Sequence, residues 1–485
     1  MTALHEQTVE QLSQALDAKE ISSQAIVQSC FERISATEHL GCFLHTDEAG
    51  ALKAAQASDD RRKKGEKLSA LDGIPVALKD NHMTADMPTT AASKILKDLQ
   101  SPYEATVTRK LRDAGAILVG KTNMDEFAMG SSNEHSAYQA VRNPWNAECV
   151  PGGSSGGSAA SVAARQVPLS LGTDTGGSIR QPAALCGVYG LKPTYGRVSR
   201  QGIIAFASSL DQVGPFARTP KDLATLLDII AGYDPLDSTS AQVETPEYSS
   251  GLEAKVEGLR IGIPKEYFGE GLQDDVRNRI EAAIESLRKA GAQVTDVSLP
   301  HTKYALSTYY LIATAEVSSN LARYDGIRYG ARIEDRDLRK MIARTRSAGF
   351  GPEVQRRIVL GTFVLSAGYY DAYYGKAQKV RTLIRKDFEN VFDSVDVILT
   401  PTSPFTAFPL GSKTNDPMSM YLSDICTLAV NLAGVPGLSV PVGFSDDGLP
   451  IGAQLIGPWF KEKRLLEVAQ HFEESLSLSN QTPNL

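Results

Sequence analysis

Two glycine- and serine-rich segments lie close together in this 485-residue chain. The first reads Gly152-Gly153-Ser154-Ser155-Gly156-Gly157-Ser158, and the second reads Asp174-Thr175-Gly176-Gly177-Ser178-Ile179-Arg180. So many glycines give more backbone freedom than the interior of a helix or strand tolerates. Bare N–H groups beside serine hydroxyls are what an enzyme needs to hold an oxyanion next to a serine nucleophile. Together the two segments predict such a site rather than two surface turns.

Lys79 is the best candidate for the base that a serine nucleophile requires. It ends an apolar run, Val76-Ala77-Leu78, that is typical of a buried strand. Burial disfavours the charged form of a lysine and therefore lowers its pKa. The neutral amine can then accept a proton from a serine hydroxyl, a role known for lysine in serine enzymes. The alternative is a lysine that reaches from the strand end into water.

Two familiar motifs match the sequence without the context that they need. Residues 115–122 satisfy the phosphate-loop pattern, but its four variable positions, Ala-Ile-Leu-Val, predict a strand instead of a loop. Residues 152–156 satisfy Gly-x-Ser-x-Gly, the nucleophile elbow of α/β-hydrolases, which requires an acid and then a histidine later in the chain. Only His301 and His471 follow, and neither lies in a glycine-rich or turn-like segment. The sequence therefore argues against a phosphate loop and against a Ser-His-Asp triad.

The elements that must position these groups alternate between strands and helices. Strands are predicted over residues 74–78, 116–119, 167–171, 259–263, 294–299, 395–400, 438–442 and 453–456, and helices over 107–114, 158–164, 274–290 and 462–474. Residues 1–65 and 301–390 are predicted to be helical, the latter as an insertion or cap rich in Tyr and Arg. This alternation indicates an α/β fold with a largely parallel or mixed sheet.

Composition and charge narrow the class of protein. Lys and Arg number 50 against 57 Asp and Glu, a net charge of −7, and the densest basic run, residues 61–64, is predicted to end a helix. No basic footprint for nucleic acid is evident, so any RNA is expected to be held mainly by a partner. The five cysteines are scattered, which argues against a disulfide framework or a zinc site. Without a recognisable signal peptide or membrane span, we predict a soluble, cytoplasmic protein.

The segments that carry the predicted chemistry resemble the amidase signature family. Lys79, Ser154 and Ser178 match its Ser-cisSer-Lys triad. The resemblance implies an α/β/α sandwich with a central mixed sheet flanked by helices and a helical insertion. It fits a division of the chain into an N-terminal helical segment (1–65), the core (66–300), the insertion over the site (301–390), and the rest of the sheet with a closing helix (391–485).

The resemblance also implies a role for each residue of the triad. Ser178 is the expected nucleophile, Ser154 passes its proton on, and Lys79 is the expected base. The turn that carries Ser178 is expected to supply the oxyanion hole through the backbone N–H groups of Thr175, Gly176 and Gly177, with that of Ser178 beside them.

Within the family, several further blocks are similar to the glutamine-hydrolysing members of tRNA-dependent amidotransferases. The similarity runs from about Leu71 into the C-terminal helix, and its blocks are residues 121–132, 142–145, 190–199 and 206–212. It implies glutamine as the substrate, with Arg357 for the α-carboxylate, Asp424 for the α-ammonium and Tyr309 as a further contact. The neighbouring Arg356 and Tyr310 leave the register open by one residue.

The same similarity implies partners. The B and C subunits of such an amidotransferase are expected to form a heterotrimer with this chain. ATP and magnesium are expected to be used in the B subunit, with no cofactor or metal in this chain. Glu-tRNA(Gln) is expected to be contacted mainly through the B subunit, and no membrane is involved. Two alternatives stay open: a free-standing amidase that acts on simple amides, and a catalytically idle scaffold.

Overall fold

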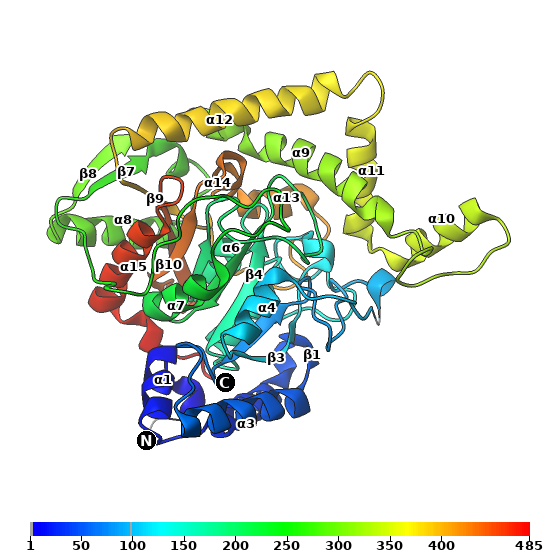
Figure 1. Ribbon diagram of the computed structural model, residues 1–485. Coiled ribbons are helices and arrows are strands. Elements are labelled where there is room, and N and C mark those ends of the chain that lie inside the picture. The colour runs from blue at the N-terminus through cyan, green and yellow to red at the C-terminus, as the bar shows by residue number, and fades with distance from the viewer. Residues whose placement is uncertain (1–2, 98) are drawn as a thin grey trace.

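Eleven strands form one mixed sheet in the computed structural model, which describes residues 3–97 and 99–485 (Figure 1). The strands are β1 (Phe43–Thr46), β2 (Pro75–Lys79), β3 (Ile117–Thr122), β4 (Leu169–Asp174), β5 (Tyr189–Lys192), β6 (Gln212–Ala217), β7 (Arg260–Pro264), β8 (Gln293–Val297), β9 (Val397–Pro401), β10 (Gly437–Phe444) and β11 (Pro450–Ile456). Their order in the sheet is β1-β3-β2-β4-β6-β5-β10-β11-β9-β7-β8. The predicted α/β class and mixed sheet are confirmed, because β2 runs parallel to β3 and β4 while β4 runs antiparallel to β6.

Fifteen α-helices accompany the sheet in the described part of the chain. They are α1 (Val9–Asp17), α2 (Ser23–Ala36), α3 (Glu48–Lys64), α4 (Thr106–Asp113), α5 (Gly156–Ala163), α6 (Arg180–Cys186), α7 (Pro220–Ile230), α8 (Asp274–Lys289), α9 (Ala305–Asn320), α10 (Leu338–Gly349), α11 (Pro352–Val364), α12 (Lys376–Phe392), α13 (Pro417–Tyr421), α14 (Leu428–Ala433) and α15 (Glu462–Leu476). The basic run at residues 61–64 is the last turn of α3, as predicted.

The helices cover both faces of the sheet and bury two separate apolar cores. Side chains of β2 show the division, since Val76 and Leu78 join the core beneath α4, α7, α8 and α15, while Ala77 faces the core shared with α2, α3, α5 and α6. Successive residues of a strand point to opposite faces, so a strand buried on both sides reads as a continuous apolar run. This arrangement is the expected α/β/α sandwich.

The phosphate-loop pattern is confirmed as a chance match. Residues 117–122 form β3, and all six are buried. Lys121, the lysine of the pattern, lies inside the protein with its Nζ 2.9 Å from the Asp80 carboxylate and 3.1 Å from the Pro88 carbonyl. A lysine held in a buried ion pair cannot serve a phosphate.

Helices α9, α10, α11 and α12 fill most of the segment from 301 to 390, which was predicted to be helical (Figure 1). In the figure α12 crosses above α9, and α10 projects away from the body of the molecule. A third apolar core joins this cap to the sheet through Tyr309, Ile312 and Ile384, which pack in one cluster with Ile398 of β9 and Ile456 of β11. The cap is thus anchored over one part of the sheet.

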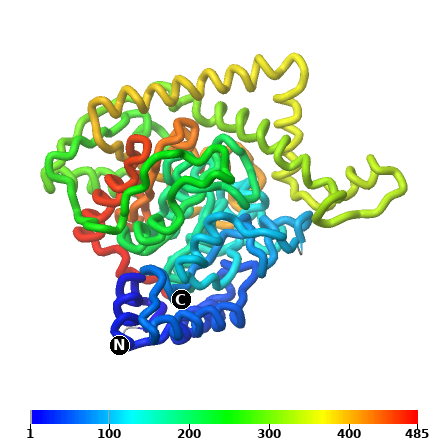
Figure 2. The backbone as a smooth tube through the Cα atoms, viewed as in Figure 1, coloured from blue at the N-terminus to red at the C-terminus, as the bar shows by residue number. Residues whose placement is uncertain are grey.

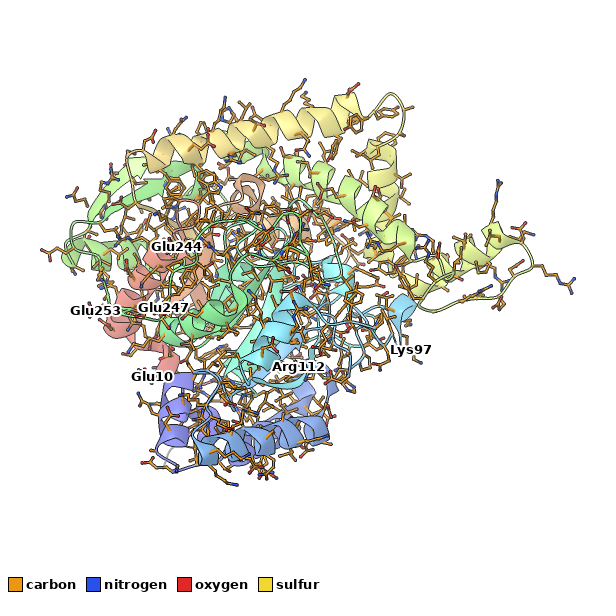
Figure 3. The ribbon with its side chains drawn as sticks, viewed as in Figure 1. Glu10, Lys97, Arg112, Glu244, Glu247 and Glu253 are labelled. Carbon is orange, nitrogen blue, oxygen red and sulfur yellow. The ribbon has the colours of Figure 1, made fainter. Side chains whose placement is uncertain are left out.

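The chain path brings its last residues back to its first helices (Figure 2). Arg165 shows this contact, because its guanidinium donates to the carbonyl of Glu6 and to those of Ser479 and Gln481. Exposed acidic side chains, among them Glu244, Glu247 and Glu253 (Figure 3), line the segment between α7 and β7. Across the described residues, the structure contains no helix that is both long enough and apolar enough to span a membrane.

Candidate active site

Lys79 ends β2 in the middle of the protein and is completely buried. Its Nζ lies 2.7 Å from Ser154 Oγ, 2.8 Å from Ser155 Oγ and 3.4 Å from the Thr173 carbonyl oxygen. Burial lowers the pKa of Lys79 to about 7, although the nearby carboxylates of Asp125 and Asp174 oppose that shift. The lowered pKa that was predicted from its position at the end of a buried strand is confirmed. The alternative of a lysine that reaches from the strand end into water is wrong, because Lys79 is completely buried.

The hydrogen bonds around Lys79 single out one proton donor. Ser155 Oγ donates to the Thr173 carbonyl at 3.1 Å, so its lone pairs are what face the amine. The Thr173 carbonyl oxygen can only accept. When Lys79 is neutral, its lone pair can therefore take a proton from Ser154 alone, at 2.7 Å. Ser155 was not predicted from the sequence. Because its own proton points to the Thr173 carbonyl, Ser154 is left as the one hydroxyl that can give a proton to Lys79.

Ser178 lies in the turn between β4 and α6, next to this lysine–serine pair. The backbone N–H of Ser155 donates to the Ser178 carbonyl at 3.2 Å, and the Gly153–Ser154 peptide bond that precedes it is cis. Ser178 retains 8% of its exposure, whereas Lys79 and Ser154 have none. Within residues 3–97 and 99–485 its hydroxyl has no hydrogen-bond partner, so of the three predicted triad members it is the one left free to meet a substrate.

The turn before Ser178 presents backbone N–H groups, but not the full set that was predicted. The N–H of Gly177 donates to Asp174 Oδ1 at 2.9 Å, so the expectation that it serves the oxyanion hole is not met. The reason is that the buried Asp174 carboxylate needs donors and takes this one, together with the N–H of Ile179 at 3.1 Å. The N–H groups of Thr175, Gly176 and Ser178 make no hydrogen bond to the described residues. Those three remain the candidates.

Asp424 lies against the same turn. A Cβ added to Gly177 would come 3.4 Å from Asp424 Oδ1, which places that oxygen next to the residue before Ser178. The other oxygen, Oδ2, accepts a hydrogen bond from Ser131 Oγ. Oδ1 is buried without a partner in the described structure. Burial raises the pKa of Asp424 to about 7, and the hydrogen bond from Ser131 and the positive charge of Arg357 oppose that shift only in part.

Arg357 is the other buried charge above the turn, on α11. Its Nε donates to Glu353 Oε1 at 2.7 Å, and no other hydrogen bond of its guanidinium is made by the described residues. The Glu353 oxygen also accepts from the Tyr421 hydroxyl at 2.8 Å, which fixes the ion pair. The terminal nitrogens of Arg357 therefore remain able to bind a carboxylate. Glu353 was not predicted, because a Glu four residues before an Arg on a helix is also a common surface pair.

The structure separates one of the two residue pairs that the sequence left open. Arg356 points outward, since 48% of its side chain is exposed, whereas Arg357 is buried between the rings of Tyr310 and Tyr421, with its Cζ 5.2 and 5.3 Å from their centroids. Tyr309 covers the turn that carries Ser178, because a Cβ on Gly176 would lie 2.7 Å from its ring. Arg357 is thus the buried member of its pair, whereas both tyrosines lie at the site, Tyr309 against the turn and Tyr310 against Arg357.

No group of three or more His, Cys, Asp or Glu side chains suited to a metal ion occurs in the part of the chain that the structure describes. The chemistry that these residues can perform is acid–base and nucleophilic. The Ser178 hydroxyl lies next to the pair of Ser154 and Lys79, whose amine has a lowered pKa. The turn that carries Ser178 also presents free backbone N–H groups. One buried acid and one buried arginine flank that serine.

Comparisons with known proteins show which family this chain resembles. Residues 25–466 match the family named Amidase. The A subunit of glutamyl-tRNA(Gln) amidotransferase from Chloroflexus aurantiacus is 59% identical over 486 residues, covering 100% of both chains, and that of Geobacillus thermodenitrificans is 56% identical over 485 residues with the same coverage. The solved structure of the same protein from Thermotoga maritima has a TM-score of 0.82 at 43% identity, over 98% of this chain and 96% of that one. The native peptide amidase of Stenotrophomonas maltophilia has a TM-score of 0.82 at 32% identity, over 98% of each chain.

Proposed function

This chain belongs to the amidase family, and from that premise we propose that it is the glutamine-hydrolysing component of a glutamyl-tRNA(Gln) amidotransferase. One observation carries the choice of glutamine among amides. A buried carboxylate oxygen without a partner in the described structure, on Asp424, and a buried guanidinium with free nitrogens, on Arg357, lie near the nucleophile turn. An α-amino acid supplies the ammonium and the carboxylate that these two groups require.

The proposed reaction begins with a neutral Lys79. Ser178 Oγ attacks the carboxamide carbon of glutamine and gives its proton to Ser154, whose own proton passes to the Lys79 amine. The N–H groups of Thr175, Gly176 and Ser178 bind the oxyanion that forms on the former carbonyl oxygen. Each such donor typically contributes about 3 to 4 kcal/mol to the transition state.

The second half of the reaction releases ammonia. The C–N bond breaks while Lys79 returns its proton through Ser154 to the leaving nitrogen, which leaves a glutamyl ester on Ser178. Water then attacks the ester by the same proton route in reverse, and glutamate leaves with the serine restored. Every bond change in both halves is accounted for by these side chains and water.

The names of the relatives support a proposal for the fate of the ammonia. We propose that it passes to the B subunit of the amidotransferase, which activates the γ-carboxylate of glutamate on tRNA(Gln) with ATP and magnesium, and that a small C subunit joins the two in the cytoplasm. The names of the relatives support this, because each is one component of an amidotransferase. The net charge of −7 is consistent with a component that leaves tRNA binding to a partner.

The test is ammonia release from glutamine, asparagine and simple aliphatic amides, with and without the B and C subunits. We expect glutamine to be preferred and its hydrolysis to rise when the partners are present. Better turnover of simple amides by the chain alone would replace the proposal with a free-standing amidase. Retention of glutamine-dependent transamidation by Ser178→Ala would overturn the proposed nucleophile.

A further inference from the structure

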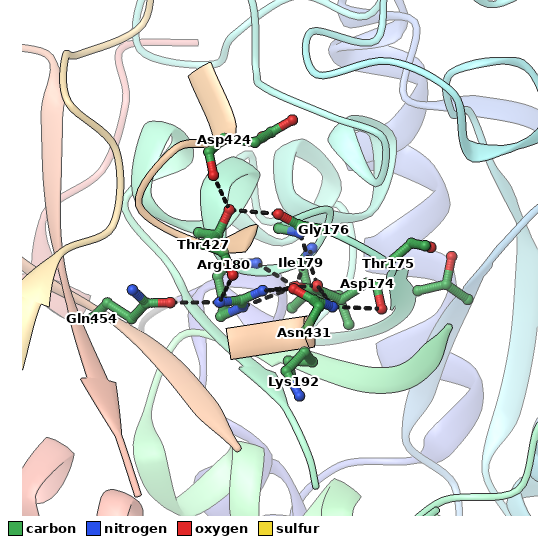
Figure 4. A network of polar contacts seen from close by, with 12 residues as sticks. Asp174, Thr175, Gly176, Ile179, Arg180, Lys192, Asp424, Thr427, Asn431 and Gln454 are labelled. Atoms are coloured by element: carbon green, nitrogen blue, oxygen red, sulfur yellow. Dashed lines mark hydrogen bonds and ion pairs between the residues drawn. The ribbon is translucent and has the colours of Figure 1, made fainter. Parts of the chain in front are cut away.

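Two segments far apart in sequence are joined by buried hydrogen bonds behind the nucleophile turn (Figure 4). One is the turn itself, residues 174–180, and the other is residues 424–431, which begin with Asp424 and continue into α14. Arg180 connects them through its Nη1, which donates to the Thr427 carbonyl at 3.1 Å, and its Nη2, which lies 2.5 Å from Asn431 Oδ1. Asn431 in turn donates to Asp174 Oδ1 at 2.9 Å.

Thr427 is the contact between the substrate-facing ends of the two segments. Its fully buried hydroxyl lies 2.6 Å from the carbonyl oxygen of Gly176 and 2.9 Å from that of Asp424. Both partners can only accept, so the single hydroxyl proton is shared between the turn and the Asp424 backbone. The contact is tight, since a Cβ on Gly177 would lie 2.2 Å from Thr427 Oγ1.

The Gly176–Gly177 peptide group is held at both ends by this arrangement. Thr427 binds its carbonyl oxygen and Asp174 binds its N–H. The peptide groups on either side carry the free N–H groups of Gly176 and Ser178, which are the candidate oxyanion donors. A peptide group is planar, so fixing the one in the middle fixes the positions of the Gly176 and Gly177 Cα atoms from which its two neighbours extend.

We propose that Thr427 is a positioning residue that couples the binding of an α-ammonium at Asp424 to the alignment of the oxyanion donors. An ammonium paired with Asp424 Oδ1 holds the 424–427 segment in place, and the Thr427 hydroxyl transmits that position to the Gly176 carbonyl. The inference rests on the proposed function only for the identity of the ligand. Its consequence is that the α-ammonium raises kcat, and not merely the affinity for the substrate.

The experiment compares glutamine with glutaramate, which is glutamine without its α-amino group. Thr427→Val removes the hydroxyl and keeps the shape, Thr427→Ser keeps the hydroxyl, and Thr345→Val removes a buried hydroxyl from α10, away from the site. The kcat and KM of each are measured in the complex with the partner subunits. Thermal unfolding checks that each variant is folded, and Thr427→Ala replaces Thr427→Val if the latter is not.

We expect Thr427→Val to lower kcat for glutamine by about 10- to 100-fold, the cost of a misplacement of catalytic groups of the order of an ångström. The ratio of kcat for glutamine to kcat for glutaramate should fall by about 10-fold or more, while Thr427→Ser and Thr345→Val keep the wild-type ratio.

Three results would overturn the coupling: equal losses of kcat for both substrates, a change in KM alone, or a Thr427→Ser variant as poor as Thr427→Val. Failure of the proposed function looks different. A wild-type enzyme that hydrolyses glutamine and glutaramate equally well contradicts the choice of glutamine, whatever the variants do.

Discussion

The site combines a catalytic region and a recognition region that are built in opposite ways. The proposed catalytic residues Lys79, Ser154 and Ser178 come from the end of β2 and from the turns before α5 and after β4, within one stretch of about a hundred residues. The proposed recognition residues Tyr309, Arg357 and Asp424 come from the helical cap and the segment before α14. The first set lies at the ends of two paired strands and in the turns beside them, whereas the second set is brought in by separate helical segments.

The two regions also differ in what they leave unsatisfied. Lys79 Nζ has three hydrogen-bond partners within the protein, while Asp424 Oδ1 and the terminal nitrogens of Arg357 have none in the described structure. A complete set of partners fixes the geometry of a reaction that any carboxamide can undergo. Buried charges without partners instead await a particular ligand. We therefore assign the amide chemistry to the residues at the strand ends, and the choice of amide to Tyr309 and Arg357 of the cap together with Asp424.

The largest expected effect comes from removing the proposed nucleophile, which should abolish the chemistry that all amide substrates share. Ser178→Ala should lower kcat for glutamine and for glutaramate alike by at least about 10⁴-fold, because triad members act as a unit. The matched control is Ser250→Ala, at an exposed position outside the site, which should leave both rates unchanged. Ammonia release measures both. A loss confined to glutamine would contradict the assignment of Ser178 to the common chemistry.

Asp424→Asn should have the next largest effect, and on one substrate only. It keeps the size of the side chain but removes the charge that an α-ammonium needs, so kcat/KM for glutamine should fall by about 10²- to 10³-fold. Hydrolysis of glutaramate should change little, and exposed Asp447→Asn serves as the control. If both substrates lose equally, Asp424 supports the turn and does not select the ligand.

Arg357→Lys should raise KM for both carboxylate-bearing amides by about 10- to 100-fold, because a lysine cannot reproduce the planar guanidinium held by Glu353. Arg356→Lys, at the half-exposed neighbouring position, should change KM by roughly twofold or less. Steady-state kinetics on glutamine and on an uncharged amide would separate the two residues. The opposite ranking would move the carboxylate contact by one residue along α11.

The smallest expected effect is a pH dependence of the wild-type enzyme, in which kcat reports on Lys79 and KM for glutamine reports on Asp424. Lys79, with a pKa lowered to about 7, must be neutral to act as a base, so kcat should rise about 10-fold from pH 6 to pH 8 and then level off. Asp424, with a pKa raised to about 7, must be ionised to bind the ammonium, so KM for glutamine should fall over the same range. Glutaramate should show the rise in kcat without the fall in KM.

Much of the sheet could be predicted because its strands are apolar runs. Strand β1 could not, because it lies within residues 1–65, which were predicted to be helical. Strands β5 and β6 could not either, because they contain Gly190, Gly214 and Pro215, which normally argue against a central strand. The structure gives the reason for the glycines. A Cβ on Gly190 would lie 2.6 Å from Ala183 of α6, and one on Gly214 would lie 2.0 Å from the Leu191 carbonyl. Close packing against a helix and a neighbouring strand requires them, and only the fold reveals those neighbours.

The site was predictable to a similar degree. Lys79 could be found because a charge at the end of an apolar run is conspicuous, and its lowered pKa follows from burial. Ser155, Glu353 and Thr427 could not be found, since each owes its role to a residue distant in sequence or to an orientation that spacing does not encode. The catalytic roles assigned to the triad remain predictions for the experiments above.

The order of synthesis on the ribosome determines when the hydrogen bonds behind the turn at residues 174–180 can form. Arg180 Nη1 lies 2.5 Å from Gln454 Oε1, a partner that is 274 residues later in the chain. At a translation rate of about 5 to 20 residues per second, that partner emerges roughly 15 to 55 seconds after the turn does. A nascent chain therefore carries Ser178 and Lys79 well before the turn can complete its hydrogen bonds, which requires the last strands of the sheet to have been made.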